Sequence, residues 1–278
     1  MKELKLRATM SQFQHHDVAI DYHVSGSIPG DPEAVTLLFV HGSYIDQTYW
    51  AEQVSYFSPR YQVVTLDLPG QGQSGRNRTD WSIEGYGDDV VALIKQLSLT
   101  RVILIGHSMG GAVALEAAVA YPQPIRSLIA IDFFKNAATA PPDEYRKQIR
   151  LIEQGLETDF TDTNEQYARQ SLVTPNTPIW LTDRIVAAFR QAYPPMGQAT
   201  TKQLFGYYER EQELLPQLPV KLHLINVDYQ STNEEPLRKY VKAGYDVIQL
   251  PGTSHYPMLE SPSLLNKAIE HVIAEITR

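Results

Sequence analysis

The 278-residue chain contains no cysteine, which excludes disulfide scaffolds, thiolate metal sites and cysteine nucleophiles. It has no apolar run of about 18 residues, the length that a membrane-spanning helix needs. Residues 1–22 lack the apolar core and the small-residue cleavage site of a signal peptide. We therefore expect a cytoplasmic protein that has no membrane partner.

Basic residues are few relative to acidic ones. The chain has 24 Lys and Arg against 32 Asp and Glu, a formal net charge of −8, so its field repels phosphate backbones. Apolar residues make up 43% and charged residues 20%, as in ordinary globular proteins. We expect a folded protein that binds a small molecule and no nucleic acid. The sequence leaves the oligomeric state open.

Apolar, β-branched runs alternate with helical patterns along much of the chain, which predicts an α/β fold with a mostly parallel sheet and helices on both faces. Nearly continuous runs are typical of strands buried on both faces. The expected strands are residues 18–24 (as part of an edge hairpin), 35–40, 61–66, 101–105, 128–131, 220–226 and 245–250. The expected helices are residues 83–97, 110–120 and 264–276.

Residues 133–219 interrupt this alternation. The segment is rich in proline and aromatic residues, and it contains helical patterns without a clear strand. The segment begins directly after Asp132, where a predicted strand ends. Its start therefore lies at the ends of the predicted strands. We expect residues 133–219 to form a helical cap over a core of residues 1–132 and 220–278.

The strongest chemical signal is the motif GHSMGG at residues 106–111, which lies between a predicted strand and an alanine-rich helix. A strand that turns sharply into a helix holds the middle residue, Ser108, in a strained and exposed conformation. Small residues at 106 and 110 allow the close approach. The helix N-terminus then favours the negative charge that develops during acyl transfer. The alternative is a glycine-rich turn whose serine has no chemical role.

A serine nucleophile needs a general base, and His255 is the predicted one. It lies in the loop PGTSHYP after a predicted strand, where a side chain can reach the edge of the sheet. The other histidines occupy positions that favour structural roles: His15, His16, His23, His41, His107, His223 and His271.

Two aspartates are candidates for the acid that orients the imidazole. Asp228 follows the strand-like run 220–226, and Asp132 ends the run 128–131. The sequence favours Asp228 and leaves Asp132 as the alternative. Either carboxylate could instead cap a helix.

The oxyanion of such a reaction needs backbone donors. Gly42 frees the backbone after the run 35–40, so the N–H of Ser43 can lie beside that of Met109. We predict that these two N–H groups form the oxyanion hole.

Residues 70–75 spell G-x-G-x-x-G, as in a dinucleotide site. The following residues do not open a helix, and no acidic residue ends a second strand about 20 residues later. No metal-binding spacing is present either. We expect no cofactor and no metal.

Several of these motifs together resemble the α/β-hydrolase superfamily, in the form of a capped serine hydrolase. The matching segments are FVHGS (39–43), Trp50, DLPGQGQSG (67–75), GHSMGG (106–111), Asp228 and PGTSHY (251–256). Gln71 stands where the family usually has histidine. The glycine that usually precedes the acid is missing near Asp228, which keeps Asp132 open.

The resemblance implies a hydrolase that cleaves small, largely uncharged carboxylic esters through a Ser-His-Asp triad and an acyl-enzyme. Epoxide hydrolases and haloalkane dehalogenases are disfavoured because they place an aspartate where Ser108 stands. A C–C bond hydrolase, a perhydrolase and a slow-turnover ligand sensor use the same residues and remain alternatives. Tyr44, Trp180 and Tyr207 are predicted to contact the substrate.

Overall fold

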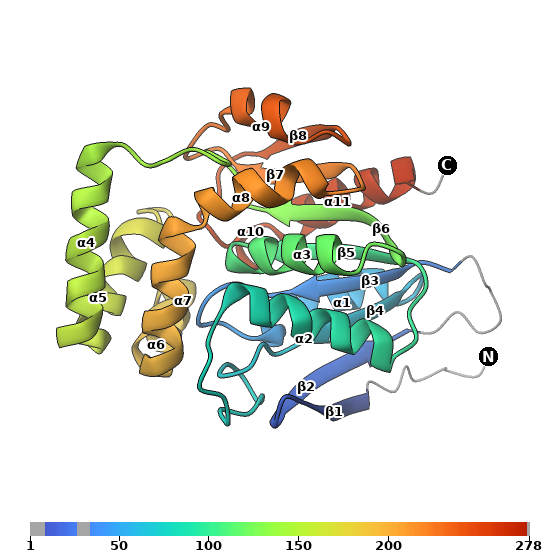
Figure 1. Ribbon diagram of the computed structural model, residues 1–278, viewed down its shortest axis with the longest axis horizontal. Helices are drawn as coiled ribbons and strands as arrows, with labels where there is room; N and C mark the ends of the chain where they lie inside the picture. Colours follow the sequence, from blue (N-terminus) through green and yellow to red (C-terminus); the bar gives the residue numbers. More distant parts are fainter. Residues whose placement is uncertain (1–8, 27–33, 277–278) are drawn as a thin grey trace.

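The computed structural model describes residues 9–26 and 34–276, and its strands form one sheet in the order β1-β2-β4-β3-β5-β6-β7-β8 (Figure 1). The strands are β1 (Thr9–His15), β2 (Val18–Ser25), β3 (Thr36–Val40), β4 (Gln62–Leu66), β5 (Val102–His107), β6 (Ile125–Ile131), β7 (Leu222–Val227) and β8 (Tyr245–Leu250). The pairs β1–β2 and β2–β4 are antiparallel, and all others are parallel. The predicted mostly parallel α/β fold is confirmed.

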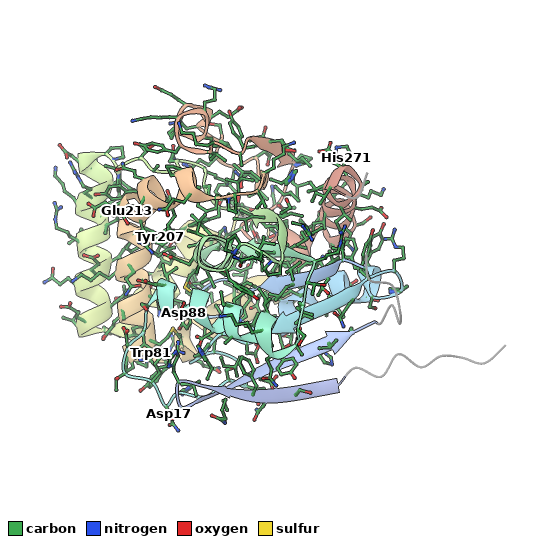
Figure 2. The ribbon with its side chains drawn as sticks, turned by 45° about the vertical axis from the view of Figure 1, so that its right-hand side comes forward. Asp17, Trp81, Asp88, Tyr207, Glu213 and His271 are labelled. Carbon is green, nitrogen blue, oxygen red and sulfur yellow. The ribbon has the colours of Figure 1, made fainter. Side chains whose placement is uncertain are left out.

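The antiparallel edge is a hairpin, as the pattern of residues 18–24 predicted. Its turn residues His16 and Asp17 both have positive φ, 45° and 63°, which is the conformation of a two-residue type I′ turn. Asp17 lies at the tip of the hairpin (Figure 2).

Helices cover both faces of the sheet, as expected. Figure 1 shows α2 and α3 on the near face, with α1 and α11 on the far face. The helices outside the segment between β6 and β7 are α1 (Ala51–Phe57, preceded by η1, Gln47–Trp50), α2 (Ile83–Gln96), α3 (Met109–Ala120), α9 (Glu234–Tyr240), α10 (Pro257–Glu260) and α11 (Pro262–Ile276). In the described part of the chain, no helix combines the length and the apolar character needed to cross a membrane.

The segment between β6 and β7 is helical throughout its described elements, and we call residues 133–219 the insertion. Its elements are α4 (Asp143–Thr158), α5 (Phe160–Tyr167), η2 (Ala168–Leu172), α6 (Ile179–Gln191), α7 (Pro194–Gly206), α8 (Tyr208–Leu214) and η3 (Leu215–Gln217). Helices α4 to α7 gather beyond one end of the sheet, whereas α8 runs back beside α3 (Figure 1). Arg210 of α8 binds Glu116 of α3 at 2.9 Å. The division into a core and a cap at residues 133 and 219 stays a prediction.

The parallel strands bring distant segments of sequence to one place. Because parallel strands all end at the same edge of a sheet, the loops after β3, β5, β6, β7 and β8 meet there. These loops carry Ser43, Ser108, Asp132, Tyr229 and His255, and they face the insertion.

Candidate active site

Ser108 occupies the sharp turn between β5 and α3. Its φ of 52° and ψ of −125° lie in a region that is strained for any residue except glycine. A Cβ on Gly106 would lie 2.1 Å from the carbonyl oxygen of Gly110, and a Cβ on Gly110 would lie 2.3 Å from that of Val40. The turn therefore closes only with glycine at both positions, and it holds Ser108 at the edge of the sheet.

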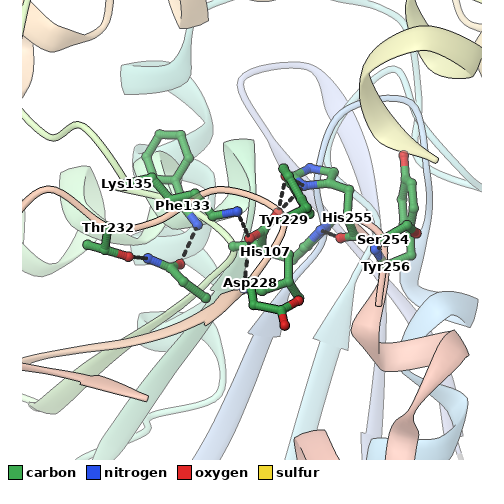
Figure 3. A network of polar contacts seen from close by, with 12 residues as sticks. His107, Phe133, Lys135, Asp228, Tyr229, Thr232, Ser254, His255 and Tyr256 are labelled. Atoms are coloured by element: carbon green, nitrogen blue, oxygen red, sulfur yellow. Dashed lines mark hydrogen bonds and ion pairs between the residues drawn. The ribbon is translucent and has the colours of Figure 1, made fainter. Parts of the chain in front are cut away.

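His255 is paired with Asp132. The distance from His255 Nδ1 to Asp132 Oδ2 is 2.6 Å, and both side chains are buried. Two further groups hold the same carboxylate (Figure 3): Lys135 Nζ lies 2.7 Å from Oδ1, and the Tyr229 hydroxyl donates to Oδ2 at 2.6 Å. The backbone N–H of Val227 also donates to Oδ1. Asp132 thus has hydrogen bonds with His255, Tyr229 and Val227 and an ion pair with Lys135.

The charge of Asp132 is maintained by these partners. Burial alone would raise the pKa of the Asp132 carboxyl. The hydrogen bond and charge of His255, together with the Lys135 ammonium, outweigh burial and hold this pKa well below its usual range. Burial and the neighbouring carboxylate raise the pKa of Tyr229, so its hydroxyl stays a neutral donor.

The preference for Asp228 as the partner of His255 is wrong. Asp228 is exposed, and its Oδ1 accepts the backbone N–H of Gly252 at 3.0 Å. The backbone N–H of Asp228 continues the β7–β8 ladder by donating to Leu250, which holds its side chain over the turn at Gly252. Figure 3 shows its carboxylate directed away from His255. The alternative, Asp132, takes the place beside the imidazole.

His107 supports His255 from behind. Its Nε2 lies 2.7 Å from the carbonyl oxygen of His255, and the two ring centroids are 4.6 Å apart. Burial, followed by the charge of His255, outweighs the hydrogen bond to this carbonyl and lowers the pKa of His107 to about 3. His107 is therefore uncharged, and its hydrogen bond stabilises the loop that carries His255.

A cavity of about 330 Å³ joins these residues. Ser43, Ser108, Asp132 and His255 line its base, and much of its wall comes from the insertion, including Tyr145, Ile149, Tyr167, Leu172, Phe189 and Phe205. Within the described residues, no lysine or arginine lines this cavity. In the same ranges, the Ser108 hydroxyl makes no hydrogen bond. Catalytic hydrogen bonds are often long in unliganded enzymes.

The loop after β3 lies against the Ser108 turn. A Cβ on Gly42 would lie 3.1 Å from the Cβ of Ser108, and the Ser43 hydroxyl lies 3.4 Å from Met109 Sδ. Across residues 9–26 and 34–276, neither the N–H of Ser43 nor that of Met109 donates a hydrogen bond. His41 anchors this loop, because its Nδ1 contacts Gly42 O at 2.8 Å and its Nε2 accepts from the N–H of Leu68.

The three aromatic residues predicted to contact substrate have different surroundings. Tyr44 lines the cavity, and its hydroxyl donates to the carbonyl of Gly197. Trp180 is 56% exposed and lies outside the cavity lining. Tyr207 (labelled in Figure 2) follows α7, and its hydroxyl donates to Glu116 of α3. The structure therefore places Tyr44 on the wall of this cavity and does not place Trp180 or Tyr207 there.

Sequence reasoning missed Lys135 and Tyr229. Lys135 follows Asp132 by three residues, and Tyr229 directly follows Asp228. Nothing in these spacings indicates that the two side chains meet on one carboxylate, because the contact depends on how β6 and β7 pair.

One group of described side chains has the ligand types and spacing for a metal ion. His223, Asp246 and Glu275 place one ligand atom each within 4.8 Å of one another. Lys221 Nζ lies 3.0 Å from Asp246 and 3.9 Å from Glu275, so an ammonium already pairs with both carboxylates. This arrangement favours an ion-pair cluster over a metal site.

Comparison with known proteins identifies the family and the fold. A family model described as "Alpha/beta hydrolase family" matches residues 37–268. The chain is 24% identical over 242 residues to the (E)-2-((N-methylformamido)methylene)succinate hydrolase of Acinetobacter baylyi, which covers 86% of this chain and 90% of that protein.

Two solved structures are similar over almost the whole chain. The enol-lactonase from Burkholderia xenovorans has a TM-score of 0.79 at 18% identity, covering 95% of this chain and 100% of that one. A thermophilic esterase from Thermogutta terrifontis has a TM-score of 0.77 at 22% identity, covering 98% and 100%. At these identities the likeness establishes the fold.

Proposed function

Because the chain belongs to the alpha/beta hydrolase family and is a hydrolase, we propose that Ser108 is its nucleophile, His255 its general base and Asp132 the acid that orients His255. One observation carries this proposal. Ser108 and His255 line the same cavity, and among the residues that the structure describes the only carboxylate on that lining is the one bound to His255 Nδ1.

The reaction that follows from these roles is acyl transfer. His255 Nε2 takes the proton of Ser108 as Oγ attacks the ester carbonyl, and Asp132 stabilises the resulting imidazolium. The free N–H groups of Ser43 and Met109 hold the oxyanion. The alkoxide leaves with the proton from His255, and water then attacks the acyl-enzyme in the same way to release the acid and Ser108.

The cavity favours a small, uncharged ester. A volume of about 330 Å³ is at the lower end of small-molecule sites, and aromatic and aliphatic side chains form most of the wall. The relative from Acinetobacter is named for a succinate, which carries carboxylates. Here the described part of the lining offers no lysine or arginine to pair with such groups, and the nearby ammonium of Lys135 is held by Asp132. The names of the similar esterase and enol-lactonase fit ester chemistry. In this proposal the insertion acts as the cap that keeps bulk water from the acyl group.

The test is the variant Ser108→Ala, assayed on p-nitrophenyl esters of graded chain length. We expect kcat to fall by about 10⁴ or more, since a triad serine is required for acyl transfer. A fluorophosphonate should label the wild-type protein and should not label the variant.

Ser171→Ala is the matched control, because Ser171 also lines the cavity. This variant should keep activity within a few-fold and should still be labelled. Ester hydrolysis or labelling that survives in Ser108→Ala would contradict the proposed function.

A further inference from the structure

The carboxylate of Asp132 binds more partners than orientation of an imidazole requires. Lys135 Nζ lies 2.7 Å from its Oδ1, and the Tyr229 hydroxyl donates to the same Oδ2 that contacts His255 (Figure 3). Lys135 Nζ also lies 3.6 Å from the centroid of the Tyr229 ring. The two side chains come from different strand-end loops and form a clasp around one carboxylate.

The clasp is enclosed. The side chain of Lys135 is 8% exposed and that of Asp132 is fully buried. Removing an ammonium from water costs several kcal/mol, and burial lowers the pKa of Lys135 while Asp132 and then Asp228 act in the opposite direction. The ion pair and the aromatic ring over the ammonium offset this cost. The position of Lys135 is therefore specified by Asp132 and Tyr229.

The clasp alters the electrostatics at His255. A lone carboxylate would stabilise a protonated imidazole with a full negative charge. Here an ammonium 2.7 Å from the same carboxylate cancels much of that charge, and the Tyr229 hydroxyl shares the acceptor oxygen. Coulomb effects are strong at such distances in a buried site.

We propose that Lys135 and Tyr229 are positioning residues that keep Asp132 ionised, reduce its pull on the imidazole proton, and so keep His255 available as a base at lower pH. The inference rests on the proposed roles of His255 and Asp132. It concerns the acid limb of the pH profile, which the triad alone does not specify.

The other ionisable neighbours of His255 do not replace this effect. His107, whose pKa burial lowers to about 3, is uncharged in the working range. Tyr256 packs edge-on against His255, and burial raises its pKa well above the usual value. Glu260 is bound to Ser254 by two hydrogen bonds and stays unchanged in the variants below. Lys135 is then the charge beside the His255–Asp132 pair that the test removes.

The test is the pH dependence of kcat/KM on one p-nitrophenyl ester. In Lys135→Met we expect the acid limb of the kcat/KM profile to move up by about one pH unit. At pH values below the limb, kcat/KM should then be about tenfold lower than in the wild type, while kcat/KM on the plateau stays within a few-fold. Tyr229→Phe should move the limb in the same direction by a smaller amount, because it removes one donor from Asp132.

Lys221→Met is the matched control. Lys221 lies 3.0 Å from Asp246, the carboxylate paired with His223 far from the cavity, and its removal should leave the limb in place. If Lys135→Met fails to fold, as judged by circular dichroism, Tyr229→Phe decides the question. An unchanged or lowered limb in the folded variants overturns this proposal. That outcome leaves the Ser108→Ala result, and so the proposed function, untouched.

Discussion

Two histidine–aspartate pairs lie at opposite edges of the same sheet. At the carboxyl end of β6, His255 Nδ1 lies 2.6 Å from Asp132. At the amino ends of β7 and β8, His223 Nδ1 lies 2.8 Å from Asp246. Each aspartate also binds a lysine, at 2.7 Å and 3.0 Å respectively. By contact geometry alone the two clusters are nearly the same.

The surroundings separate them. The Asp132 side chain is fully buried at the base of a cavity that Ser108 also lines. The Asp246 side chain is 33% exposed, and among the described residues it is not part of the lining of the cavity beside Ser108. A histidine–aspartate contact therefore does not by itself identify a candidate active site. The strained serine and the cavity are what distinguish one pair from the other.

The most direct test of the difference between the two pairs is to remove the aspartate charge from each of them. In Asp132→Asn we expect kcat on a p-nitrophenyl ester to fall by about 10³ to 10⁴, because the imidazole loses its orienting carboxylate. In Asp246→Asn the change should stay within twofold. Asp228→Asn should also stay within twofold, since its carboxylate holds only a turn. Equal losses in the Asp132 and Asp246 variants, with both folded by circular dichroism, would remove the distinction.

The fold, and the two residues Ser108 and His255 that meet at one cavity, could be predicted from the sequence. Ser108 sits in a motif whose glycines are required by contacts of 2.1 Å and 2.3 Å that a Cβ would make, so the local sequence encodes the turn. His255 follows a strand at a recognisable place in the chain. These features depend on residues that are close together in sequence.

The acid that we propose, Asp132, could not be predicted in the same way. Asp132 and Asp228 both follow strands that end at the same edge of the sheet, so position along the chain does not separate them. The choice depends on the pairing of β6 with β7 and on the hydrogen bond from Asp228 N–H to Leu250. Those contacts join residues that are far apart in the sequence, and the local sequence pattern does not predict them.

Another buried acid, Glu211, can be compared with Asp132. Glu211 of α8 is buried like Asp132, but it accepts only the N–H of Ala138 and has no cation beside it in the described residues. Burial raises the pKa of Glu211 from 4.5 to about 7, against that one hydrogen bond. The difference from Asp132 shows what the charged partners contribute.

The expected consequence is a stability that depends on pH. Because the folded-state pKa of Glu211 lies above the unfolded value of 4.5, its contribution is fully present below about pH 4.5 and is lost as pH rises through 7. Glu211→Gln should therefore stabilise the protein by about 3 kcal/mol at pH 8 and by little at pH 4.5. Urea unfolding at both pH values measures this. Glu209→Gln, an exposed change on the same helix, should alter neither value. A variant no more stable than wild type at pH 8 would contradict the prediction.

The same rule, position relative to the cavity rather than residue type, applies to the aromatic residues of the insertion. Phe189 lines the cavity and packs edge-on against Tyr44, with ring centroids 4.8 Å apart, whereas Trp180 is 56% exposed. Phe189→Leu should raise KM for the preferred ester several-fold, about 1 kcal/mol, because it removes apolar contact from the substrate wall. Trp180→Ala should change KM by less than twofold. Steady-state kinetics on esters of graded length measure both, and a larger effect from Trp180 would mean that substrate contacts the outer surface of the insertion.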